Sequence, residues 1–90
     1  MEKKELCVFG QVLVSAREKF GVSQAELARR IGRDQRALSK TENGLHEPKI
    51  SSILMYAQAL GMRSGDLMNA YEDAVAEETA RRSAAPGVDS

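Results

Sequence analysis

Residues 23–44, with the sequence SQAELARRIGRDQRALSKTENG, predict two short helices joined by a tight turn, here called the two-helix unit. Ser23 is expected to cap the first helix, and Glu26, three residues later, to reach back and complete a capping box. The apolar positions of this helix fall on one face and are Leu27, Ala28 and Ile31. Gly32 can take the left-handed conformation in which many helices end, so a turn is predicted there.

The second helix of the unit is expected from Gln35 to Asn43, because Asp34 is a good N-cap and Gly44 can end the helix. Its inward positions are predicted to be Ala37, Leu38 and Thr41. Its opposite face carries Gln35, Arg36, Ser39 and Lys40. Such a face is either a solvated helix surface or one that reads base edges, since it offers an amide, a guanidinium, a hydroxyl and an ammonium.

Further motifs occur before and after the two-helix unit. They are Phe9-Gly10, Leu13, Ala16-Arg17, GVSQAELARRIG over 21–32, Leu38-Ser39, ENG over 42–44, Pro48, the apolar run over 53–61, and Leu67. On these residues the chain resembles the Cro/cI-type helix-turn-helix family of phage repressors and bacterial regulators over residues 9–69. The resemblance implies an all-α, five-helix phage-repressor-like domain in which the second and third helices bind double-stranded DNA.

The resemblance also implies a role for individual residues. Base contacts are implied at Gln35, Arg36 and Lys40, with Ser39 on the same face. Arg36 suits guanine and Gln35 suits adenine, because each can make a bidentate contact to that base. Phosphate contacts are implied at Gln24 and Asn43, whereas Arg33 is open between phosphate contact and plain exposure. Arg17 and Glu42 are implied to form a structural ion pair.

Four features depart from the family pattern. Arg33 stands where a small apolar residue is usual, and Val14 replaces a common basic residue. Thr41 stands where a large apolar residue is usual, which predicts looser packing of the third helix. The loop over 45–47 ends in Glu47 instead of supplying lysine or arginine, and this carboxylate would repel a nearby phosphate.

Outside the two-helix unit, three helices are expected. The first covers residues 5–20, with the apolar stripe Leu6, Phe9, Leu13, Ala16 and Phe20. The fourth covers 50–60, with Ile50, Ile53, Leu54, Ala57 and Leu60 inward. The fifth begins at Ser64 and extends to Arg82, with the stripe Leu67, Tyr71, Ala74 and Val75. The DNA-binding domain is therefore assigned to 1–69, the extension of the fifth helix to 70–83, and a disordered tail to 84–90.

The composition of the 90-residue chain is that of one small domain. Its 13 basic and 13 acidic residues cancel, but they are unevenly distributed. Residues 10–69 hold nine basic and six acidic side chains, whereas residues 70–90 hold two basic and five acidic ones. A mildly basic DNA-binding part predicts weak non-specific affinity, so specific binding must rely on base contacts and on two subunits acting together.

Composition and motifs argue against several other functions. No apolar run is long enough for a membrane span, and the N-terminus does not have the pattern of a signal peptide. A single cysteine fits a reducing cytoplasm. The chain is expected there, and to be nucleoid-associated when bound to DNA. Ser39 has no histidine to activate it, so no enzyme is expected, and neither a metal nor a cofactor is expected. No small-molecule ligand is expected either, because no second domain could build a pocket for one.

The sequence therefore predicts a small prokaryotic or phage transcription regulator that binds a palindromic operator as a homodimer. Repression by blocking polymerase and activation by contacting it are both open. So is membership of a phage, restriction-modification or toxin–antitoxin system. One alternative is an antitoxin-like interaction module whose acidic residues 70–90 bind a protein partner. Another is a degenerate helix-turn-helix that only dimerises.

Overall fold

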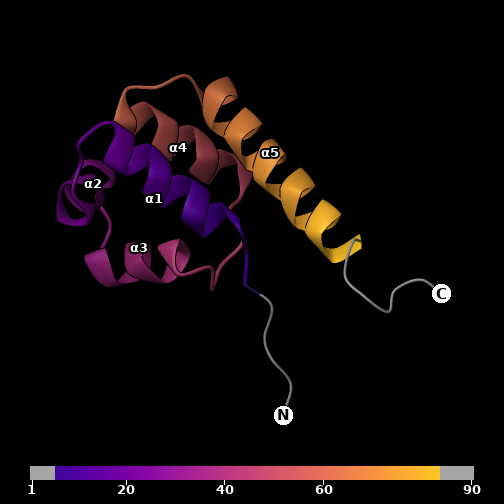
Figure 1. The fold of residues 1–90 in the computed structure, drawn as a ribbon. Coiled ribbons are helices and arrows are strands. Elements are labelled where there is room, and N and C mark those ends of the chain that lie inside the picture. The colour runs from indigo at the N-terminus through magenta and orange to yellow at the C-terminus, as the bar shows by residue number, and fades with distance from the viewer. Residues whose placement is uncertain (1–5, 84–90) are drawn as a thin grey trace, which may run out of the picture.

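The computed structural model describes residues 6–83 and contains five α-helices and no strand in this range (Figure 1). The helices are α1 (Phe9–Lys19), α2 (Gln24–Ile31), α3 (Gln35–Glu42), α4 (Ile50–Leu60) and α5 (Ser64–Ser83). The all-α, five-helix prediction is thereby confirmed. The tail predicted over 84–90 and the predicted helix start at Glu5 lie outside the described residues.

The core receives side chains from every helix. Its fully buried large side chains are Phe9, Leu13, Leu27, Leu38 and Leu67. The Phe9 ring also lies 5.9 Å from the Tyr56 ring and 5.1 Å, edge-on, from the Tyr71 ring, measured between centroids. Because these rings come from α1, α4 and α5, one aromatic cluster holds three helices together.

Helix α1 packs against α3, α4 and α5, while α2 packs against α3 and α4. The contact between α1 and α3 is unusually close at Gly10. A Cβ added there would collide with the backbone carbonyl oxygens of Thr41 and Glu42, so only glycine allows this approach. The short distance brings the last turn of α3 directly onto the first turn of α1, which positions the two-helix unit on the rest of the fold.

The first helix is shorter than the sequence predicted, because it begins at Phe9 and ends at Lys19. Leu6 and Phe20 therefore lie outside it and are exposed, at 59% and 44%, so their place in the apolar stripe was wrong. The buried face is Phe9, Val12, Leu13 and Ala16. The residues of this face are spaced three and four apart, so they form a complete apolar stripe without Leu6 and Phe20.

Helix α4 has the predicted bounds, but two of its predicted inward residues are exposed, Ile50 by 67% and Leu54 by 50%. The buried face is Ile53, Tyr56, Ala57 and Leu60. Leu54 lies about 100° round the helix from Ile53, which turns it away from that face. Ile50 lies in the first turn, where the exposed fraction shows that no other helix covers it.

Helix α5 begins at Ser64, as predicted, and extends to Ser83. Leu67 is buried, and Tyr71 and Ala74 are packed against the core, but Val75 is 44% exposed and does not join them. Val75 lies about 100° round the helix from Ala74, which turns it away from the core. The C-terminal part of α5 extends beyond the other helices (Figure 1). No helix within residues 6–83 is both long enough and apolar enough to cross a membrane.

Candidate DNA interface

Local hydrogen bonds set the bounds of α2 and α3. Ser23 caps α2 by accepting a hydrogen bond from the backbone N–H of Glu26 at 3.0 Å. Gly32, with φ of 68°, ends the helix in the left-handed conformation. Asp34 then caps α3 by accepting from the N–H of Arg36 at 3.4 Å. Ser23 thus fixes the start of α2, and Gly32 and Asp34 specify the turn between the helices, as the sequence predicted.

Glu26 does not complete the predicted capping box. Its carboxylate instead accepts hydrogen bonds from Arg29 and Arg30, one helical turn further on. These bonds, chiefly the one from Arg29, lower the pKa of Glu26 to about 2. Two guanidinium groups attract a carboxylate more strongly than one neutral amide does, which explains the correction. Arg30 also donates to the Ala59 carbonyl at 2.8 Å and so ties α2 to α4.

Arg17 and Glu42, the pair implied by the resemblance, form a bidentate ion pair between α1 and α3. The Arg17 Nε and Nη2 atoms lie 2.7 and 3.0 Å from the two carboxylate oxygens. The side chains are only 13% and 4% exposed. The hydrogen bond to Glu42 is the main reason that the pKa of Arg17 is raised. Arg17 also donates to the Val22 carbonyl at 3.0 Å, so it ties the segment before α2 and the end of α3 to α1.

Gln24 extends this network to the start of α3. Its Nε2 donates to Glu42 at 2.8 Å, and its Oε1 accepts from the Nε2 of Gln35 at 3.0 Å. A continuous path of hydrogen bonds therefore runs from Arg17 through Glu42 and Gln24 to Gln35. The path holds the amide of Gln35 in one orientation, which is what a bidentate contact to a base edge requires.

The exposed face of α3 carries Gln35, Arg36 and Lys40. Arg36 and Lys40 form no ion pair with any residue in 6–83, so their charges are uncompensated within that range. Ser39 is half-buried and accepts a long hydrogen bond from Asn43 at 3.5 Å. The structure thus brings all the base-contact candidates onto one helix, with Asn43 directly after its end.

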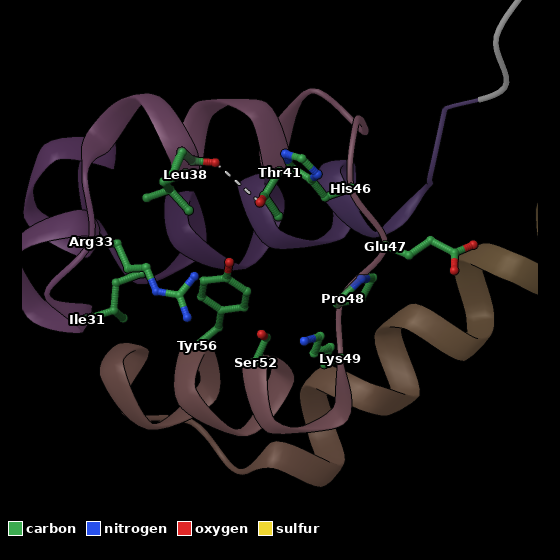
Figure 2. Close-up of a pocket in the computed structure, with 11 residues that line it drawn as sticks. Ile31, Arg33, Leu38, Thr41, His46, Glu47, Pro48, Lys49, Ser52 and Tyr56 are labelled. Atoms are coloured by element: carbon green, nitrogen blue, oxygen red, sulfur yellow. Dashed lines mark hydrogen bonds between the residues drawn. The ribbon is translucent and has the colours of Figure 1, made fainter.

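Of the three predicted inward residues of α3, only Leu38 is buried. Ala37 is exposed, contrary to the prediction, and Thr41 is half-buried. Both line a cavity of about 300 Å³ between α3 and α4, here called the α3–α4 cavity (Figure 2). Its other lining residues are Ile31, Arg33, Leu38, His46, Glu47, Pro48, Lys49, Ser52 and Tyr56. The looser packing expected at Thr41 is therefore present as a defined space.

Sequence reasoning did not single out Lys49 as a functional residue. Lys49 is the exposed N-cap residue of α4 and, like Arg33, lines the cavity without an ion pair to a described residue. Arg33, in the turn of the two-helix unit, and Lys49, after that unit, therefore border the same cavity beside α3. The available signal was a basic residue placed directly after Pro48, at the start of a helix.

Comparisons with known proteins agree with this geometry. The model of the Cro/cI-type helix-turn-helix family matches residues 13–67. The clp gene regulator ClgR from Corynebacterium glutamicum is 26% identical, with a TM-score of 0.76, covering 84% of this chain and 81% of that one. The restriction-modification controller protein C.AhdI from Aeromonas hydrophila is 33% identical, with a TM-score of 0.62, covering 68% and 92%.

A third solved structure, the hypothetical transcription factor NHTF from Neisseria, is 30% identical, with a TM-score of 0.60, covering 74% of this chain and 85% of that one. No curated protein matches the chain. The family match covers more than half of the chain and contains the whole two-helix unit. The chain therefore belongs to the Cro/cI-type helix-turn-helix family of DNA-binding transcription regulators.

Proposed function

We propose that the chain binds double-stranded DNA sequence-specifically as a homodimer, with α3 in the major groove, and regulates transcription from a palindromic operator. The observation that carries this proposal is the exposed face of α3. There, the uncompensated cations Arg36 and Lys40 lie on the same helix as an amide, Gln35, that a hydrogen-bond path already orients. A solvated face would not require an oriented amide.

The proposed roles follow from the chemistry of each side chain. Arg36 makes a bidentate contact to guanine and Gln35 to adenine, while Ser39 and Lys40 make the remaining base contacts. Phosphates are bound by Gln24, Asn43 and Arg33, and we add Lys49 to this set because it is an uncompensated cation at the N-terminus of α4.

The dimer is proposed because one mildly basic subunit offers few phosphate contacts. Two copies place two α3 helices about 34 Å apart on one face of DNA, which matches consecutive major grooves. We assign the contact between copies to residues 64–82, which include the exposed Val75 and most of the C-terminal part of α5 that extends beyond the other helices. Two structurally similar proteins, ClgR and C.AhdI, are named as a gene regulator and a controller protein, which supports a regulatory role.

The experiment is selection of purified full-length protein on a randomised double-stranded DNA library at near-physiological salt. We expect a two-fold symmetric site with half-sites about one helical turn apart. Arg36→Ala should lose about 1–3 kcal/mol of binding free energy and accept other bases at one position of each half-site. Arg63→Ala is the matched control, since it removes the same charge from the exposed loop between α4 and α5.

The outcomes separate the proposal from its alternatives. If Arg36→Ala and Arg63→Ala lost equal binding free energy, α3 would contribute to DNA binding only through its positive charge and not through base contacts. Absence of any enriched site, from protein with an intact helical spectrum, would refute sequence-specific binding. It would favour the protein-partner alternative, which is motivated by the four acidic residues Glu72, Asp73, Glu77 and Glu78 of α5.

A further inference from the structure

The α3–α4 cavity exists because Thr41 does not fill the space beneath α3. The Thr41 hydroxyl turns back onto its own helix and donates to the Ala37 carbonyl at 3.3 Å. Figure 2 shows the space left between Leu38 and Thr41 on α3 and Ser52 and Tyr56 on α4. Its volume of about 300 Å³ is at the lower end of the range found for small-molecule sites.

The wall of this cavity combines apolar and polar groups. Apolar surface comes from Ile31, Leu38 and Pro48, and hydroxyls come from Thr41, Ser52 and Tyr56. Tyr56 as a residue is only 4% exposed, yet its hydroxyl makes no hydrogen bond to another described residue. No buried side-chain nitrogen or oxygen within residues 6–83 lacks a hydrogen-bond partner, so this unpaired hydroxyl is accessible to solvent and presents a polar anchor beside an apolar surface.

The charge at the mouth of the cavity is positive. Arg33 and Lys49 line it and form no ion pair within residues 6–83. Glu47 also contributes to the lining, but Figure 2 shows its carboxylate pointing away, toward α5. Consistent with that direction, Glu47 adds to the raised pKa of Tyr71 on α5, which burial of Tyr71 chiefly causes. The two cations are therefore left without a carboxylate partner at the cavity.

We propose that the α3–α4 cavity binds a small organic carboxylate. The ligand has about ten non-hydrogen atoms, because about that many groups of the size of a water molecule fit into the cavity. Arg33 and Lys49 hold the carboxylate, the Tyr56 hydroxyl donates to it, and the apolar body lies against Ile31 and Leu38. This reverses the expectation that a ligand site needs a second domain, because one small side chain at Thr41 is enough to open a site inside the single domain.

Such a ligand opposes DNA binding, and this consequence rests on the proposed function. Arg33 and Lys49 are proposed to bind DNA phosphates, and each guanidinium or ammonium that holds the carboxylate is withdrawn from the DNA backbone. The ligand also lies directly against α3. Binding of the carboxylate and binding of DNA are therefore negatively coupled, and each weakens the other by the same factor.

The first experiment titrates the ¹⁵N-labelled full chain, without DNA, with phenylacetate, with its neutral analogue phenylacetamide, and with inorganic phosphate. Phenylacetate should saturate with a dissociation constant of about 1 mM and shift amide signals over 37–41 and 46–52. Phenylacetamide should bind at least about five-fold more weakly, because it lacks the charge. Unsaturable shifts, equal binding of the neutral amide, or shifts outside the cavity would overturn the proposal.

Variants test the position of the site. Thr41→Leu fills the cavity, so it should abolish phenylacetate binding while raising the melting temperature. Gln58→Leu is the control, because Gln58 is exposed on α4 and does not line the cavity. Arg33→Ala should weaken binding about three-fold or more, whereas Arg63→Ala should not. Arg33 is exposed, so this comparison remains decisive even if Thr41→Leu fails to fold. Unchanged phenylacetate binding in Arg33→Ala would overturn the proposal.

The last experiment measures affinity for the selected DNA with and without saturating phenylacetate, using fluorescence anisotropy and sodium chloride of equal ionic strength as the control. DNA binding should weaken about three-fold or more. Unchanged DNA affinity with a filled cavity would refute the coupling. A chain that selects no DNA would refute the proposed function, and the titration without DNA would still decide whether the cavity binds the carboxylate.

Discussion

The carboxylate of Glu42 is bound by three donors, two from Arg17 and one from Gln24, in a nearly buried position between α1 and α3. Glu42→Ala should therefore leave the Arg17 guanidinium without its partner and lower the free energy of unfolding by about 3–5 kcal/mol. Urea denaturation followed by circular dichroism measures this loss.

The matched control is Glu26→Ala, because Glu26 also pairs with arginines but on the surface. Solvent screens exposed pairs of this kind, so they contribute little to stability. If the two variants lost equal stability, the buried pair would not be the anchor of the two-helix unit.

Gly10 is the second residue on which the position of α3 depends. Gly10→Ala should destabilise the fold by about 1–3 kcal/mol, since its Cβ meets backbone carbonyl oxygens that cannot move without shifting α3. Gly65→Ala is the control, because nothing lies within 4 Å of a Cβ there and the first turn of α5 favours alanine. Thermal melts of both variants provide the comparison, and a neutral Gly10→Ala would contradict the close approach.

Glu26 should also affect the response of the fold to acid. Its pKa is about 2 in the folded chain, against 4.5 for an unperturbed glutamate. The ion pairs with Arg29 and Arg30 therefore stabilise the fold fully above pH 4.5, and that contribution is lost as the pH falls toward 2. Between these values, the urea midpoint of Glu26→Gln should fall less steeply than that of the wild type. Glu72→Gln, at an exposed position, should follow the wild type.

At the scale of elements, α2 and α3 act together through the amides of Gln24 and Gln35. Gln24→Ala removes the acceptor that orients Gln35, so base discrimination should fall at the position read by Gln35 and remain intact at the position read by Arg36. Binding to single-substitution variants of the selected DNA site measures this pattern. A uniform loss at every position would show that Gln24 acts only through phosphate contact.

Lys49, at the junction between the two-helix unit and α4, should contribute to the salt dependence of DNA binding. Lys49→Gln is expected to weaken binding to all DNA sequences alike and to reduce the slope of log affinity against log salt by about one unit. The matched control is Lys19→Gln, which removes the same charge at the end of α1, before α2. A sequence-dependent effect of Lys49→Gln would assign this side chain to base contact instead.

At the scale of the whole molecule, the projecting part of α5 is the feature that a single copy leaves uncovered. Val75→Glu should shift a dimer toward monomer in sedimentation velocity without lowering the melting temperature, because Val75 contributes little to its own core. Gln58→Glu is the charge-matched control, because Gln58 is exposed on α4 and lies outside the proposed contact. A wild-type chain that remains monomeric at roughly tens of micromolar would contradict the assignment of the dimer contact to this helix.

The sequence by itself determined the number of helices, the turn between α2 and α3, and the fold family. Capping residues, left-handed glycines and apolar periodicity act within a few residues of one another, so their effects can be read without a structure. Ser23, Gly32 and Asp34 are the clearest cases, since each holds the conformation that its residue type favours.

Only the tertiary structure decided which side chains are covered and where the apolar groups leave a space. Ile50, Leu54 and Phe20 have core-like residue types but lie where no other helix covers them. The hydrogen-bond path from Arg17 to Gln35 and the α3–α4 cavity each join residues from several elements. Their geometry depends on how the helices pack, and packing between distant segments leaves no periodic signal in the chain.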